Sequence, residues 1–210
     1  MNTNSKGYNQ RKIIESYSQT FLQHGDAPEA VQWSEDGQRW RFEKLIEIMV
    51  CASGQSLNGH RILEIGCGLG HFYPMLCSVF AEVDYTGIDI VPEMIAHAKS
   101  VYLGANFECR DIFNFPIQQE YGFVFISGVF NAPFFSDSKE IMAAMLAQAY
   151  AASRIGMAFN FTSSHVNFVS EGANYFDPGW VLNEVLSKLS KKVVMHHHYR
   201  NCAVAVGVYR

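Results

Sequence analysis

The segment RILEIGCGLG, residues 61–70, joins an apolar run to a glycine-rich turn and decides the predicted fold. Its apolar part, residues 62–65, predicts a short buried strand, and residues 71–80 predict a helix. The glycines between them permit backbone conformations that other residues avoid, and they let a ligand approach the main chain closely. Open α/β sheets bind nucleotides where such a strand ends and a helix begins, so we expect a nucleotide-like ligand at this turn.

Composition indicates a single globular domain spanning residues 1–210, because 49% of the residues are hydrophobic and only 17% are charged. The net charge of -4 gives no general attraction to nucleic acid or to an anionic membrane. Lys188, Lys191 and Lys192 form either a local basic face or a solvated helix end. Five cysteines without a CxxC pair, a polar N-terminus and no apolar run of about 18 residues predict a cytoplasmic protein that does not bind membranes. The oligomeric state is unknown from the sequence.

The order of apolar patterns predicts a helical lid followed by an α/β core. Two helical patterns, at about residues 8–23 and 38–52, precede the first strand and define a lid of residues 1–55. In the core, residues 56–210, expected strands alternate with helices and end in a hairpin; the strands after the first are 82–89, 105–110, 121–127, 155–161, 192–199 and 202–209. This alternation predicts a mostly parallel sheet with helices on both faces and an antiparallel last strand.

The spacing of the glycines distinguishes between two classes of nucleotide-binding turn. The dinucleotide fingerprint GxGxxG requires a glycine at position 71, where this chain has His71, and this disfavours a nicotinamide-dependent oxidoreductase. The pattern E-x-G-x-G-x-G over residues 64–70, with Asp89 ending the next strand, instead resembles the class I S-adenosylmethionine-dependent methyltransferases. The resemblance implies a Rossmann-like sheet of seven strands and S-adenosylmethionine as the cofactor. It places the cofactor against the loop residues Gly66, Cys67, Gly68 and Gly70.

Three residues beside this loop are candidates for contacts with the cofactor. Asp89 ends the second strand, where its carboxylate is expected to accept hydrogen bonds from both ribose hydroxyls. Ile90 either packs on the adenine or fills the core. Glu64 organises the loop, reaches the cofactor ammonium through water, or is a purely structural acid.

The resemblance assigns further contacts to the turns after the third and fourth strands. Asp111 and Ile112 match the position at which family members hold the adenine, unless Asp111 only starts a turn with Asn114. Ser127 and Gly128 follow the fourth strand and are expected to face the sulfonium, where small residues let the cofactor and the acceptor approach. The Asn/Asp-Pro-Pro-aromatic motif of many amide- and base-nitrogen methyltransferases does not follow this strand, which disfavours those acceptors.

The segment around Trp33 and Arg41 is similar to the small-molecule methyltransferases of the trans-aconitate methyltransferase-like group. The resemblance gives Arg41 the cofactor carboxylate, which the planar guanidinium fork suits, whereas the alternative is a surface ion pair with Glu43 or Glu47. We therefore expect methyl transfer to a small-molecule acceptor by direct displacement, without a nucleic-acid partner. The alternatives are a protein or RNA methyltransferase and a non-catalytic S-adenosylmethionine-binding protein of the same fold.

The catalytic residues are unknown from the sequence. His165 and Tyr175, beyond the fifth strand, are the candidates for a general base, although many methyl transfers need only alignment of the reactants. No metal is expected at the histidines of residues 196–198. Alternate residues of a strand point to opposite faces, which leaves only His196 and His198 together without a third ligand.

Overall fold

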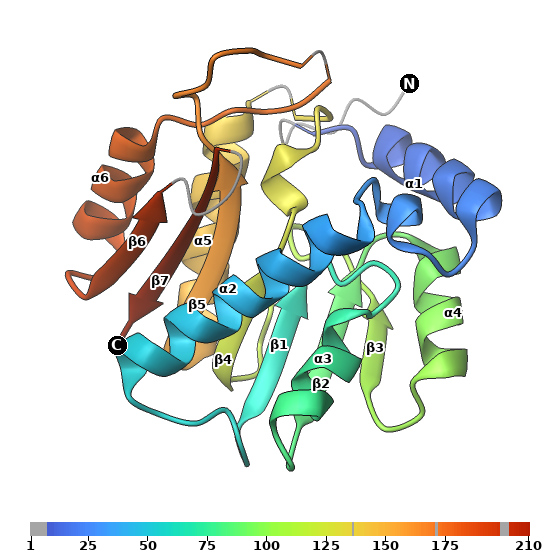
Figure 1. Cartoon of the computed structure of the whole chain (residues 1–210), viewed down its shortest axis with the longest axis horizontal. Coiled ribbons are helices and arrows are strands. Elements are labelled where there is room, and N and C mark those ends of the chain that lie inside the picture. Colours follow the sequence, from blue (N-terminus) through green and yellow to red (C-terminus); the bar gives the residue numbers. More distant parts are fainter. Residues whose placement is uncertain (1–7, 136, 171, 198–201) are drawn as a thin grey trace.

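The computed structural model describes residues 8–135, 137–170, 172–197 and 202–210. A seven-stranded sheet with the order β3-β2-β1-β4-β5-β7-β6 runs through the molecule (Figure 1). The strands are β1 (Arg61–Ile65), β2 (Asp84–Asp89), β3 (Asn106–Cys109), β4 (Tyr121–Ile126), β5 (Ser153–Thr162), β6 (Val193–His197) and β7 (Ala203–Tyr209). Only β7 is antiparallel to its neighbours, β5 and β6. The predicted Rossmann-like sheet with an antiparallel last strand is confirmed.

The helices are α1 (Gln10–His24), η1 (Pro28–Val31), α2 (Glu35–Ser53), α3 (Phe72–Val79), α4 (Pro92–Val101), η2 (Val129–Asn131), α5 (Ser138–Ala152) and α6 (Pro178–Lys188). Local chemistry sets where several of them begin. The Ser34 side chain accepts a hydrogen bond from the Gly37 N–H, and Asp177 accepts one from the Trp180 N–H. Such caps satisfy backbone donors that have no partner inside the helix. None of the described helices is both long enough and apolar enough to cross a membrane.

The N-terminal helices divide differently from the predicted lid of residues 1–55. Helix α2 crosses one face of the sheet and packs on β5 and β7, with Leu45 and Met49 completely buried (Figure 1). It is therefore part of the layer that covers the sheet. Helices α1 and η1 lie at one end of the sheet, and α1 also contacts α4. We call residues 8–33 the lid segment below, because they border the site and α2 mostly does not.

Burial on both faces fixes the sheet. All six residues of β4 are buried, as expected for a central parallel strand between two helical layers. One apolar cluster joins β4 to α5 through residues such as Met142 and Leu146, and a second joins it to α2 and α3 through Leu45 and Phe72. Because β1, β2, β3 and β4 pair in parallel, their carboxyl ends lie along one edge, where the turns that follow them meet.

Candidate functional site

One carboxylate holds the glycine-rich turn in place. The turn contains three glycines with positive φ angles, Gly66 (76°), Gly68 (53°) and Gly70 (80°). Asp89, at the end of β2, accepts a hydrogen bond from the Gly68 N–H on Oδ2 at 2.8 Å and one from the Val91 N–H on Oδ1 at 3.0 Å. Burial raises the pKa of Asp89, although these backbone donors oppose the shift. Asp89 therefore ties β1, β2 and the start of α4 together.

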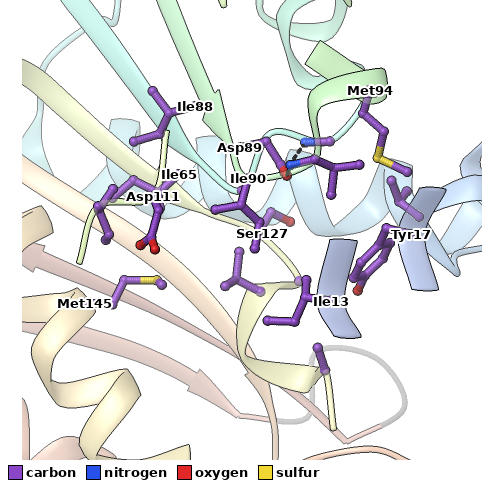
Figure 2. A pocket seen from close by; sticks show the side chains of 18 of the residues that line it. Ile13, Tyr17, Ile65, Ile88, Asp89, Ile90, Met94, Asp111, Ser127 and Met145 are labelled. Carbon is purple, nitrogen blue, oxygen red and sulfur yellow. Dashed lines mark hydrogen bonds between the residues drawn. The ribbon is translucent and has the colours of Figure 1, made fainter. Parts of the chain in front are cut away.

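A cavity of about 140 Å³ opens at this edge of the sheet (Figure 2). Eight of the predicted cofactor-binding residues line it: Gly66, Gly68, Asp89, Ile90, Asp111, Ile112, Ser127 and Gly128. Figure 2 shows Asp111 and Met145 toward one end in this view, Tyr17 of α1 toward the other, and Asp89 and Ser127 between them. The lid segment contributes Tyr8, Ile13, Tyr17, Val31 and Trp33, which the sequence did not assign to the site.

Asp111 both lines the cavity and caps a turn. Its Oδ1 accepts a hydrogen bond from the Phe113 N–H at 2.9 Å, and its Oδ2 accepts one from Asn114 Nδ2 at 2.5 Å. The Tyr8 hydroxyl of the lid segment also donates to Oδ2, and burial together with Asp111 raises the pKa of Tyr8. The two alternatives for Asp111 are thus compatible. An adenine amino group would therefore have to share a carboxylate oxygen with one of these donors or displace it.

Three of the predicted loop contacts lie outside the described cavity lining: Glu64, Cys67 and Gly70. Glu64 is buried on β1, where Oε2 of its carboxyl group accepts a hydrogen bond from the Tyr85 hydroxyl. Cys67 packs on β2, since a Cβ atom on Gly87 would lie 2.8 Å from its Sγ. A Cβ on Gly70 would meet the Phe107 ring at 2.7 Å. These residues support the turn from the side that does not line the cavity, and their contact with a cofactor stays a prediction.

The buried Glu64 should make stability depend on pH. Burial, above all, raises its pKa from 4.5 to about 8, with the Tyr85 hydrogen bond opposing and the Asp89 charge adding to the shift. Between these values the folded chain holds a proton that the unfolded chain releases, so the stability is complete below the lower value and declines as the pH rises through the upper one. Thermal unfolding at several pH values should show this decline in the wild type and a flatter profile in Glu64→Gln. The exposed control Glu43→Gln should keep the decline, and equal profiles for wild type and Glu64→Gln would contradict the assignment.

A second, more polar cavity of about 540 Å³ adjoins the first. The two share Tyr17, Val31, Trp33, Gly128 and Ala132, and the second also contains Gln32, Ser34, Asp36, Trp40, Arg41 and Asn131. The Arg41 guanidinium lies 3.4 Å from the centre of the Trp33 ring and 4.0 Å from that of Trp40, and it donates to the Gly37 carbonyl. Glu47 forms an ion pair with Lys44 at 2.5 Å. Arg41 is thus positioned in a cavity wall beside the predicted cofactor site.

Asn160 of β5 fixes the turn that joins the two cavities. Its side chain is 1% exposed; Oδ1 accepts a hydrogen bond from the Gly128 N–H at 2.8 Å, and Nδ2 donates to Ser127 Oγ at 3.1 Å. Trp33 covers the turn from the lid segment, since a Cβ on Gly128 would lie 2.6 Å from its ring. Asn160 was not predicted from the sequence. The available signal was one amide side chain in the otherwise apolar run of residues 155–161.

Replacing Asn160 by leucine should therefore disturb the turn more than the strand. The change leaves the Gly128 N–H and Ser127 Oγ without their buried partner, which costs about 1–3 kcal/mol per unsatisfied group. We expect a corresponding loss in the free energy of unfolding by urea, and weaker binding of S-adenosylhomocysteine measured by calorimetry. Asn183→Leu, on the exposed side of α6, is the control. If Asn160→Leu binds and unfolds like the wild type, the turn keeps its conformation without the Asn160 hydrogen bonds.

The two candidates for a general base lie on the segment between β5 and α6, outside the described lining of both cavities. His165 is exposed, with Nε2 3.4 Å from Asp177 Oδ2. The Tyr175 hydroxyl accepts a hydrogen bond from the Ser170 N–H at 2.9 Å. A catalytic role for either stays a prediction. Of the histidine triplet, His198 lies outside the described residues, so its expected pairing with His196 is not described.

Comparison with known proteins identifies the family. The sequence profile of a methyltransferase domain matches residues 62–156. Rv1506c of Mycobacterium tuberculosis, a protein assigned as a methyltransferase with no acceptor named, is 32% identical over 146 residues, which cover 66% of this chain and 86% of the relative. The chain belongs to the methyltransferase family. The malonyl-[acyl-carrier protein] O-methyltransferase of Bacillus anthracis is 32% identical over 84 residues, but these cover only 39% of this chain and 30% of that enzyme.

Solved structures agree with this assignment at the level of the fold. The magnesium protoporphyrin IX methyltransferase ChlM from Synechocystis PCC 6803, with bound S-adenosylmethionine, superposes on this methyltransferase with a TM-score of 0.71 at 15% identity, covering 99% of this chain and 100% of ChlM. The N-methyltransferase NodS from Bradyrhizobium japonicum WM9, in complex with S-adenosyl-l-homocysteine, gives 0.66 at 16% identity, covering 94% and 97%. The expected enzyme class, an S-adenosylmethionine-dependent methyltransferase, and its cofactor are confirmed.

Proposed function

We propose that this methyltransferase transfers the methyl group to a polar small-molecule acceptor by direct displacement. The observation that carries the proposal is the junction of the two cavities at Gly128. On one side of the junction lie the carboxyl ends of the strands, with Asp89 and Asp111. On the other lies a cavity lined by Ser34, Asp36 and Asn131, among others, which suits a hydrophilic molecule better than an acyl chain or a macrocycle.

The residues of the first cavity fit an adenosine. The Asp89 carboxylate suits ribose hydroxyls, since a carboxylate only accepts hydrogen bonds, and Ile90 and Met145 offer apolar surface to a flat base. Ligand sites usually measure about 300–1,000 Å³, so a cavity of about 140 Å³ is too small for the whole cofactor. We therefore assign the methionine portion to the junction, where Arg41 would bind its carboxylate.

The remaining residues act by positioning. When bound, S-adenosylmethionine supplies a methyl group activated by its sulfonium. The nucleophilic atom of the acceptor forms a bond to this methyl group as the methyl–sulfur bond breaks, and a proton on that atom, if present, passes to water. Burial, and then the Asp89 charge, raise the pKa of Tyr17 to about 12, so its hydroxyl stays protonated at the junction and serves as a hydrogen-bond donor. No histidine or lysine stands among the described residues that line the second cavity, and its carboxylate, Asp36, is paired with Arg39 at 2.6 Å, which favours alignment over base catalysis.

Calorimetry with S-adenosylhomocysteine, followed by turnover assays with methyl-labelled S-adenosylmethionine, tests the proposal. We expect binding at one site and label transfer to members of a panel of polar small molecules. Failure to bind would overturn the assigned site. Label transfer only to proteins or RNA would overturn the small-molecule acceptor, and binding without transfer to any acceptor class would favour a non-catalytic protein of this fold.

A further inference from the structure

Three titratable side chains from three separate parts of the sequence meet beside the lid segment, outside the described lining of both cavities. Asp26 follows α1, His71 precedes α3 directly after the glycine-rich turn, and His97 lies on α4. His71 Nε2 is 2.7 Å from Asp26 Oδ1, and His97 Nε2 is 3.2 Å from Asp26 Oδ2. The Phe21 ring of α1 packs on the His97 ring, with centroids 5.4 Å apart.

This cluster lies where the lid segment packs against the glycine-rich turn. A small group of buried apolar residues, Ala30, Leu69, Val91 and Met94, joins η1 to the turn and to α4. Ser18 of α1 also donates a hydrogen bond to Glu93 Oε2 at 2.9 Å. Because Tyr17 and Val31 of the same segment line both cavities, the position of the lid segment determines their shape.

We propose that Asp26, His71 and His97 form a pH-sensitive clasp that holds the lid segment against the glycine-rich turn. Imidazoles change charge between about pH 5 and 8. When they are protonated, both can pair with the Asp26 carboxylate, and charge-assisted contacts of this kind are about twice as strong as neutral ones. When they are neutral, only the His71–Asp26 hydrogen bond remains, because the His97 contact does not have hydrogen-bond geometry. The clasp therefore loosens as the pH rises through this range.

Two groups at the clasp, Asp26 and Tyr102, keep the same charge across this range. Burial raises the pKa of Asp26, but the contacts with His71 and His97 and their charges outweigh it and lower the pKa overall, so the carboxylate is ionised throughout. Tyr102, at the end of α4, has a pKa raised first by burial and then by Asp26, so it stays neutral. Glu93, also on α4, accepts the Ser18 hydrogen bond on the lid side. His71 Nδ1 is buried and has no hydrogen-bond partner in the described part of the chain. The two histidines therefore have different surroundings, and each requires its own variant.

The effect of the clasp on cofactor affinity depends on the proposed function, whereas its effect on the lid segment does not. Two measurements separate them: amide hydrogen exchange of residues 10–24 in the free protein, and the dissociation rate of S-adenosylhomocysteine. Both are made at about pH 5.5 and about pH 8, with EDTA present to remove free metal ions. The proteins compared are the wild type, Asp26→Asn, His71→Gln and His97→Gln. Glu15→Gln, which removes an exposed charge paired with Arg11 on α1, is the control.

We expect dissociation from the wild type to be about fivefold faster at the higher pH, the equivalent of about 1 kcal/mol. Asp26→Asn should dissociate at both pH values as fast as the wild type does at the higher one. Titration of the cofactor and of Glu64 affects every variant alike, so the difference between variants isolates the clasp. Exchange in α1 should follow the same order, compared between variants at equal pH, and Glu15→Gln should match the wild type.

An unchanged pH ratio in Asp26→Asn would overturn the clasp, and so would equal exchange of α1 in the wild type and Asp26→Asn at the lower pH. If Asp26→Asn does not fold, the single histidine variants decide, because each should lose part of the pH ratio. If S-adenosylhomocysteine does not bind to the wild type at either pH, the proposed cofactor site fails. The exchange data still decide whether the clasp exists.

Discussion

Asp89→Ala should bind S-adenosylhomocysteine about 10- to 150-fold more weakly than the wild type, which corresponds to roughly 1.5–3 kcal/mol for lost hydrogen bonds to a charged group. Two losses combine in this variant. The cavity loses the carboxylate that we assign to the ribose, and the Gly68 and Val91 N–H groups lose their acceptor. Calorimetric titration at fixed pH measures the change directly.

Two further variants separate the charge of Asp89 from its position. Asp89→Asn keeps the shape but turns one acceptor into a donor, which cannot serve both N–H groups, so we expect an intermediate loss of affinity. Asp84 begins the same strand, is exposed and lies 3.7 Å from Arg61 Nε, so Asp84→Asn should bind like the wild type. An affinity of Asp89→Ala within about twofold of the wild type would remove Asp89 from the cofactor site.

The sheet was predictable because its signals are local. The run of residues 121–126 is apolar throughout and forms β4 with every residue buried, and the turns that follow the strands lie where glycine and aspartate mark them. What α2 covers was not predictable. Its pattern establishes that the helix has an apolar face, but it does not say whether that face covers a ligand or β5 and β7, so the helix was assigned to the lid.

Which residues gather at the candidate site was predictable where they follow strand ends and not where they depend on contacts between distant segments; their contact with a cofactor stays a prediction. Asp89 is the last residue of β2 and Asp111 lies two residues beyond the end of β3, so the topology alone brings them to one edge. Tyr8 reaches Asp111 across 103 positions in the sequence, and Asn160 reaches Gly128 across 32. No periodicity encodes such pairs. Glu64 shows a different limit of the sequence. Its position in the motif was clear, but packing sets the orientation of its side chain, which points toward Tyr85.

Gly66→Ala should lower the free energy of unfolding by about 2–5 kcal/mol, the largest loss of stability that we expect from one methyl group in this chain. Two effects add. The φ angle of 76° is strained for any residue with a side chain, at a cost of about 1–2 kcal/mol. The new Cβ would also lie 2.2 Å from Val129 Cγ2, so the backbone or Val129 must move, and overpacking of this kind costs about 1–3 kcal/mol. Urea denaturation measures the sum.

The two effects can be separated because the chain provides a control for each. Gly54, after α2, has a φ of 65°, and a Cβ added there would have nothing within 4 Å, so Gly54→Ala should show the strain alone. Val129→Ala removes Cγ2 and leaves the next contact at 3.6 Å, an ordinary distance, so it should restore about 1–3 kcal/mol when combined with Gly66→Ala. If Gly66→Ala and Gly54→Ala lower the free energy of unfolding equally, Val129 moves aside without a loss of stability. The turn after β1 and the turn after β4 would then be independent, and a cofactor bound between them could not rely on their fixed separation.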